Sequence, residues 1–154
     1  MRFTSLFIAF ALSLTLLAGC GPSKNPFGAV YLEGTVTLDG SPIEGVNVNL
    51  IPRGGDLTAG GLTDATGKFT VTIAGSEVGT GAKPGEYDVT FSKVEVAGQD
   101  LSFDEFMKKY GNKQPETTYL VPQKYGSPQT SGVEPITVST KKANNKFTFA
   151  LTSQ

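Results

Sequence analysis

Apolar and polar residues alternate along most of the chain from Val30 onward. The alternation runs over residues 30–38 and recurs over 46–50, 69–73, 87–91, 136–138 and 147–151, with a further short segment around Leu62. A period of two is typical of a strand with one buried and one solvated face. Turn-forming pairs such as Asp39-Gly40 and Asn144-Asn145 separate these segments. The pattern predicts an all-β fold of about seven short strands, packed as an antiparallel two-sheet sandwich or, alternatively, closed as a small barrel.

Residues 97–132 depart from this alternation. Ser102 and Glu105 have the spacing of a capping box, which marks the start of a helix. The apolar residues that follow recur at i, i+3, i+4 and i+7, as expected for one helical face: Phe103, Phe106, Met107 and Tyr110. Gly111 is a suitable C-terminal stop. The spacing therefore predicts one short helix over 103–110, inserted between strands.

The following segment, residues 119–132, is interrupted by Pro and Gly and is predicted to be an extended loop that crosses the sandwich. Loops on a rigid scaffold often carry function. The candidate surface for a ligand or partner comprises the helix and loop residues Tyr110, Tyr119, Lys124 and Tyr125. In the alternative interpretation, Tyr119 and Tyr125 only attach the loop to the body of the domain.

The first 19 residues have the pattern of a signal peptide. Arg2 gives a positive start, and an apolar run from Leu6 to Ala18 follows, which is shorter than the roughly 20 residues that a bilayer-spanning helix needs. Cys20, the sole cysteine of the chain, comes directly after this run. Residues 20–29 then form a short tether before the first predicted strand.

The sequence Leu17-Ala18-Gly19-Cys20 resembles the lipobox of bacterial lipoproteins. This resemblance implies cleavage before Cys20, a diacylglycerol on its thiol and an acyl chain on the new amine. Because Gly21 rather than Asp follows the cysteine, the chain resembles lipoproteins sorted to the outer membrane. We therefore expect a cell-envelope protein that is attached to its membrane by lipid. A plain secretory signal with a chance cysteine and an uncleaved apolar helix are the alternatives.

Four motifs resemble, in order, the carboxypeptidase regulatory-like domain: Gly34-Thr-Val36, Gly40-Ser-Pro42-Ile-Glu-Gly45, Thr63-Asp64-Ala-Thr-Gly67-Lys-Phe69 and Lys-Pro84-Gly85-Glu-Tyr87. The resemblance implies a seven-stranded antiparallel Greek-key β-sandwich of the transthyretin-like type over residues 30–154, with residues 97–132 as an insertion. These motif residues form turns and strands, so the resemblance points to a fold and not to a catalytic site.

Composition excludes several classes of function. The chain has no His, one Cys and a net charge of −1. It therefore lacks the usual general base, the ligand set of a zinc site and the basic patch that nucleic acid requires. We expect no enzyme activity, no metal, no cofactor other than the covalent lipid, and no nucleic-acid partner. The predicted function is a non-catalytic envelope lipoprotein, structural or for protein interaction, with an envelope protein as its partner. The alternative is a module that binds envelope or extracellular polysaccharide, although the chain has no Trp.

Overall fold

The computed structural model describes residues 25, 27–55, 57–77 and 79–154, and these residues fold mostly as β-strands. The predicted signal peptide, Cys20 and most of the tether lie outside the described residues. Within the described ranges, no helix is both long enough and apolar enough to cross a bilayer.

The first of the larger sheets is built around β1 (Glu33–Leu38). On one side β1 pairs with β11 (Lys146–Leu151), and on the other it pairs with β2 (Ser41–Pro42) and β5 (Lys68–Thr70). The β1–β11 pair is parallel, which departs from the antiparallel arrangement predicted from sequence. The cause is a crossover: the turn η2 (Lys142–Asn144) brings the chain from the second sheet to the end of the first sheet where β1 begins.

The second of the larger sheets is antiparallel throughout. Its order is β10 (Ile136–Val138), β7 (Gly85–Ser92), β3 (Asn47–Pro52), β4 (Ala59–Leu62) and β6 (Thr72–Ile73). Six registered residue pairs join β3 to β7, from Asn47 opposite Ser92 to Pro52 opposite Tyr87. These two long strands form the centre of the sheet.

The alternating segment over 69–73 forms two strands and not one. β5 belongs to the first sheet and β6 to the second, with the buried Val71 between them. The backbone passes so close to Gly61 that a Cβ atom there would lie 2.1 Å from the carbonyl oxygen of Thr70. The alternation of apolar and polar residues cannot reveal that the chain passes from one sheet to the other at Val71, because both short strands bury the same face of the segment. Val30, placed at the start of a strand from its pattern, forms only an isolated bridge with Ala82.

The two larger sheets share one hydrophobic core. The rings of Phe91 on β7 and Phe149 on β11 meet across the sheets, with centroids 5.0 Å apart. Phe69 on β5 lies 6.2 Å from Phe149 and fills the space over Gly34. A Cβ atom at position 34 would lie 2.6 Å from the Phe69 ring, so glycine is required there for this packing.

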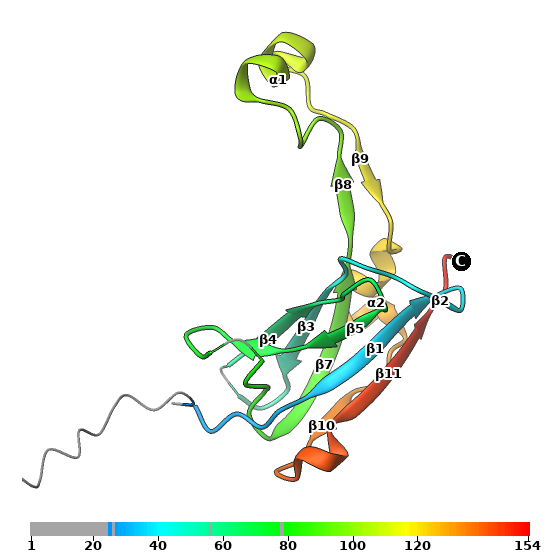
Figure 1. The fold of residues 1–154 in the computed structure, drawn as a ribbon. Helices are drawn as coiled ribbons and strands as arrows, with labels where there is room; N and C mark the ends of the chain where they lie inside the picture. Colours follow the sequence, from blue (N-terminus) through cyan, green and yellow to red (C-terminus); the bar gives the residue numbers. More distant parts are fainter. Residues whose placement is uncertain (1–24, 26, 56, 78) are drawn as a thin grey trace, which may run out of the picture.

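A third, two-stranded sheet carries the predicted helix away from the core. β8 (Val94–Val96) and β9 (Thr117–Tyr119) pair as an antiparallel ribbon, and α1 (Phe103–Tyr110) lies at its far end (Figure 1). The helix prediction over 103–110 is confirmed, including the capping box between Ser102 and Glu105. We call residues 94–119 the arm. Figure 1 shows that the arm projects from the two larger sheets.

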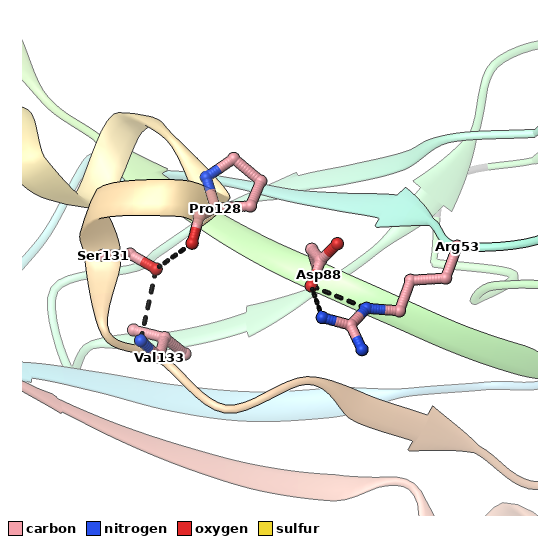
Figure 2. A network of polar contacts seen from close by, with 5 residues as sticks. All are labelled: Arg53, Asp88, Pro128, Ser131 and Val133. Carbon is pink, nitrogen blue, oxygen red and sulfur yellow. Dashed lines mark hydrogen bonds and ion pairs between the residues drawn. The ribbon is translucent and has the colours of Figure 1, made fainter.

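The segment after the arm returns to the body and packs on β7. It contains the 3₁₀ turn η1 (Gln123–Gly126) and the single-turn helix α2 (Pro128–Ser131), and both contact β7. The predicted extended loop is therefore wrong in conformation. Pro122 is the residue directly before η1, and Pro128 is the first residue of α2, where the fixed φ angle of proline suits the start of a helix. Figure 2 shows α2, where the Ser131 hydroxyl accepts a hydrogen bond from the backbone N–H of Val133, beside the Arg53–Asp88 ion pair.

Candidate functional site

The four residues predicted to form one surface lie in two places. Tyr110 and Tyr119 belong to the arm, whereas Lys124 and Tyr125 belong to η1 on the body. Tyr119 is 51% exposed and lies opposite Val94 in the β8–β9 ribbon. The four residues therefore do not form a single aromatic platform.

Tyr125 attaches the segment after the arm, which contains η1 and α2, to the C-terminal residues. Its ring is buried, and its hydroxyl accepts a 2.9 Å hydrogen bond from the backbone N–H of Thr152. The Lys124 ammonium lies 5.0 Å from the centre of the Tyr125 ring and donates to the carbonyl oxygen of Gln154. These contacts agree with the attachment role considered from sequence for Tyr125.

The arm carries four of the six exposed large apolar side chains of the described residues; the other two, Leu62 and Ile51, belong to the second of the larger sheets. Phe103 is 77% exposed and Met107 is 42% exposed, and no residue of α1 is buried. Phe106 and Tyr110 cover each other in part, with ring centroids 5.0 Å apart. Val94 on the ribbon is also exposed. The helical period identified Phe103 and Met107 from sequence, whereas nothing in the local pattern distinguished Val94 from a buried strand residue.

A second candidate site is a groove of about 600 Å³ on the outer face of the first sheet. We call it the outer groove. Its lining includes outward-facing residues of β1, β5 and β11, together with Tyr31 and the exposed Leu62 of β4. The polar and charged lining side chains include Tyr31, Glu33, Asp64, Lys68, Lys146 and Thr148. This site could not be predicted from the sequence, because its residues alternate with core residues on strands that are distant in the chain.

Glu33 is the centre of the charge network in the outer groove. Its carboxylate accepts a hydrogen bond from the Tyr31 hydroxyl at 2.9 Å and forms a 2.8 Å ion pair with the Lys146 ammonium. The Lys142 ammonium lies 4.1 Å from the centre of the Tyr31 ring. The bond from Lys146, followed by the bond from Tyr31, holds the pKa of Glu33 below its ordinary value. The bond to Glu33 raises the pKa of Tyr31.

The groove chemistry suits binding through hydrogen bonds and charge. Glu33 is ionised at neutral pH, and each of its two carboxylate oxygens already has one partner, Lys146 on one and Tyr31 on the other. Asp64 is similarly occupied, because it accepts hydrogen bonds from the backbone N–H groups of Thr66 and Lys68. Across the described ranges, no three His, Cys, Asp or Glu residues gather closely enough to hold a metal ion.

The low pKa of Glu33 predicts a pH-dependent stability effect. A carboxyl group whose folded-state pKa is lowered adds stability above its ordinary pKa and loses it as the pH falls through the folded value. We expect Glu33→Gln to have a lower melting temperature than wild type at pH 7. The difference should disappear as the pH falls through the folded-state pKa of Glu33, which lies below the ordinary value. Thermal unfolding at a series of pH values measures this difference.

Glu44→Gln is the matched control for this pH series. It removes an exposed carboxylate and changes the net charge equally, but the described structure gives Glu44 no ion pair or hydrogen bond. We expect its melting temperature to follow wild type across the series. A difference between Glu33→Gln and wild type that stays constant down to the acidic end of the series would show that the Lys146 and Tyr31 contacts are not its source.

Comparison with known families and with curated proteins adds no relative. No family model matches the chain, and the search of curated proteins finds no match. The proposed function therefore rests on the sequence motifs and on the geometry of the arm and the outer groove.

Proposed function

We propose that this chain is a non-catalytic, membrane-anchored cell-envelope lipoprotein that acts as a protein-interaction module, with the arm as its partner-binding element. The observation that supports this proposal most directly is the exposure of Phe103 and Met107 on α1, a helix that buries none of its residues. Large apolar side chains gathered on a projecting element are typical of contact surfaces, because exposing them to water without a partner is unfavourable.

In this proposal the membrane anchor is Cys20, which carries diacylglycerol on its thiol and an acyl chain on its amine. The lipobox-like sequence before it supports this assignment, and Gly21 supports the outer membrane as its location. Two or more acyl chains anchor a protein stably. The first described residues lie near the start of β1, whereas α1 lies far from them at the end of the ribbon (Figure 1). A short tether would thus hold the body near the membrane and leave the arm free to reach a partner.

We further propose that residues 30–154 form a carboxypeptidase regulatory-like domain with the transthyretin-like, seven-stranded Greek-key sandwich. The sheet orders β5-β1-β11 and β4-β3-β7-β10 support this proposal, since they arrange the seven predicted strands as two sheets around one core. In this interpretation β2 and β6 are short additions to the seven strands. The predicted insertion, residues 97–132, comprises most of the arm and the segment with η1 and α2 that packs on β7.

The proposed partner is a protein of the envelope. A partner with an apolar groove would bury the α1 side chains at i, i+3, i+4 and i+7, which is the spacing used by helices that dock in grooves. Aromatic side chains such as Phe103 supply much of the binding energy when they become fully desolvated. The absence of His and the satisfied carboxylates of the outer groove support a non-catalytic role.

The outer groove favours one alternative function, the binding of envelope or extracellular polysaccharide. The aromatic ring of Tyr31 and the polar side chains on three strands give the groove the mixed character that sugar ligands use. Under this alternative the groove holds the ligand and the arm does not contact it. The tyrosines predicted from sequence, at 110, 119 and 125, contribute nothing to that groove.

Crosslinking in intact native cells tests the two functions. We expect wild-type protein to be recovered with one recurrent protein adduct. In Phe103→Ser/Met107→Ser the adduct should fall at least ~5-fold, because the loss of about 1 kcal/mol of contact energy already costs this factor. The melting temperature should be unchanged, since both residues are exposed.

The control variant is Thr148→Ala in the outer groove, where Thr148 is exposed and lies away from the arm. Its protein adduct should equal that of wild type. Recovery of polysaccharide with no recurrent protein, and sensitivity to Thr148→Ala but not to the arm variant, would replace the proposed function by the alternative.

A further inference from the structure

Three lysines gather at the turn that leads into β11. Lys141 and Lys142 lie at the start of η2 and are exposed, and Lys146 is the first residue of β11. The Lys142 ammonium lies 4.1 Å from the centre of the Tyr31 ring, and the Lys146 ammonium forms a 2.8 Å ion pair with Glu33. Among the described residues, no carboxylate forms an ion pair with Lys141 or Lys142. Three ammonium groups against one carboxylate leave this group with a net charge of +2.

The fold holds these lysines beside the start of β1. The carbonyl oxygen of Asn145 accepts a 3.1 Å hydrogen bond from the backbone N–H of Glu33, and its side-chain amide donates to the carbonyl oxygen of Tyr31 at 3.3 Å. Asn145 is fully buried, so these bonds attach η2 firmly to the first strand. In Figure 1, η2 (orange) and the described start of the chain (blue) lie at the end of the body away from α1. We call Tyr31, Lys141, Lys142 and Lys146 the basic surface.

The chain between the proposed anchor and the body is very short. Asn25 and Ala29 exchange two hydrogen bonds of 2.7 Å each, between the Asn25 side chain and the Ala29 backbone, and Ala29 belongs to the core. Asn25 is therefore already attached to the body. Cys20 is five residues before Asn25, and five residues span at most ~18 Å. An acylated Cys20 would thus keep this end of the body close to the lipid headgroups.

We infer that the basic surface binds the phosphate headgroups of the membrane that holds the anchor. The inference rests on the proposed function, because it requires that Cys20 carries lipid. Lysine side chains near a membrane surface attract anionic headgroups, and tyrosine suits the boundary between lipid and water. The Glu33 carboxylate opposes this attraction little, since Lys146 already neutralises it. The lipid surface is favoured over a soluble polyanion because the short tether presents headgroups at this end of the body permanently.

The contact is weak by itself and depends on the anchor. Only three lysines take part, and salt screens exposed charges beyond ~8 Å at physiological ionic strength. The anchor keeps the headgroups at a high local concentration, so a weak contact is enough to orient the body. The contact would turn η2 toward the membrane and α1 away from it, where the arm can meet a partner. The basic surface alone would not hold an unanchored chain.

Lysine footprinting of the full protein tests the inference. Protein purified in detergent from cells that express the whole chain is inserted into preformed vesicles, made either of equal parts phosphatidylglycerol and phosphatidylcholine or of phosphatidylcholine alone. Brief acetylation and mass spectrometry then measure the labelling of each lysine. We expect at least ~5-fold less labelling of Lys141, Lys142 and Lys146 on the anionic vesicles than on the neutral vesicles. Lys108 and Lys109, an exposed pair on α1, should be labelled equally on both.

Charge reversal supplies the second measurement, with Lys146 as the reporter. In Lys141→Glu/Lys142→Glu, the labelling of Lys146 on anionic vesicles should rise to its level on neutral vesicles. The matched control Lys108→Glu/Lys109→Glu changes the net charge equally but on the arm, and it should leave Lys146 protected. Both lysine pairs are exposed, so the melting temperatures of the two variants should equal that of wild type.

The N-terminal peptide in the same digest gives the state of Cys20 and separates this inference from the proposed function. Equal labelling on both kinds of vesicle, with an acylated Cys20, would overturn the basic surface and leave the anchor standing. An unmodified Cys20 would overturn the anchor and the inference together. Equal protection of Lys141 and Lys142 in detergent by inorganic phosphate or dextran sulfate, without vesicles, would assign the surface to soluble anions and overturn the lipid surface as its partner.

Discussion

Phe91→Ala is expected to lower the free energy of unfolding by about 3–5 kcal/mol, the usual cost of removing a buried phenylalanine ring. Phe91 is 1% exposed and meets Phe149 with ring centroids 5.0 Å apart, which joins β7 of one sheet to β11 of the other. Alanine leaves a cavity between the sheets that neither rigid sheet can close fully. Urea unfolding of the purified protein, followed by circular dichroism, measures the change.

Phe103→Ala is the matched control, because it deletes the same ring from the arm. Phe103 is 77% exposed, so we expect a change of less than about 0.5 kcal/mol. A large loss from Phe103→Ala would mean that the arm packs on the body and that its apolar residues serve stability. A small loss from Phe91→Ala would contradict the single core shared by the two larger sheets.

Cys20→Ser is expected to move the protein from the membrane fraction to the soluble envelope fraction. The substitution removes the thiol that the lipobox-like sequence Leu17-Ala18-Gly19-Cys20 would present for lipid attachment. Without acyl chains, only the short apolar segment before residue 20 could hold the chain at the membrane. Fractionation, detergent extraction and the mass of the N-terminal peptide measure the result.

Ser23→Ala is the control for the anchor, since Ser23 lies three residues after the cysteine and outside the lipobox-like sequence. It should stay with the membrane at wild-type level. Retention of Cys20→Ser in the membrane would show that the apolar segment remains uncleaved and anchors the chain. The proposed lipid attachment would then fail, while the argument for the arm would be unaffected.

Features that depend on neighbouring residues could be predicted from the sequence. The helix over 103–110 follows from a local cap at Ser102 and a local apolar period, and both are present in the structure. Most of the alternating residues likewise became strands, because the period of two is a local property of each segment. The predicted helix also placed Phe103 and Met107 on one apolar face, although the candidate surface predicted from sequence did not include them.

Features that depend on distant segments could not be predicted. The parallel pairing of β1 with β11 results from a crossover between sheets, and the division at Val71 results from the close approach to Gly61. Tyr125 is buried through a contact with Thr152, 27 residues away in the chain. The outer groove could not be predicted either, because Glu33 and Lys146 are far apart in the sequence and become neighbours only in the folded sheet.

Site-specific photo-crosslinking in intact cells tests the central claim, that the arm is the partner-binding element, most directly. A photoreactive phenylalanine derivative is placed at position 103 on α1 or at position 148 in the outer groove, two exposed positions on separate parts of the molecule. We expect a discrete protein adduct from position 103 and none from position 148. Polysaccharide adducts from position 148, with no protein adduct from position 103, would contradict it.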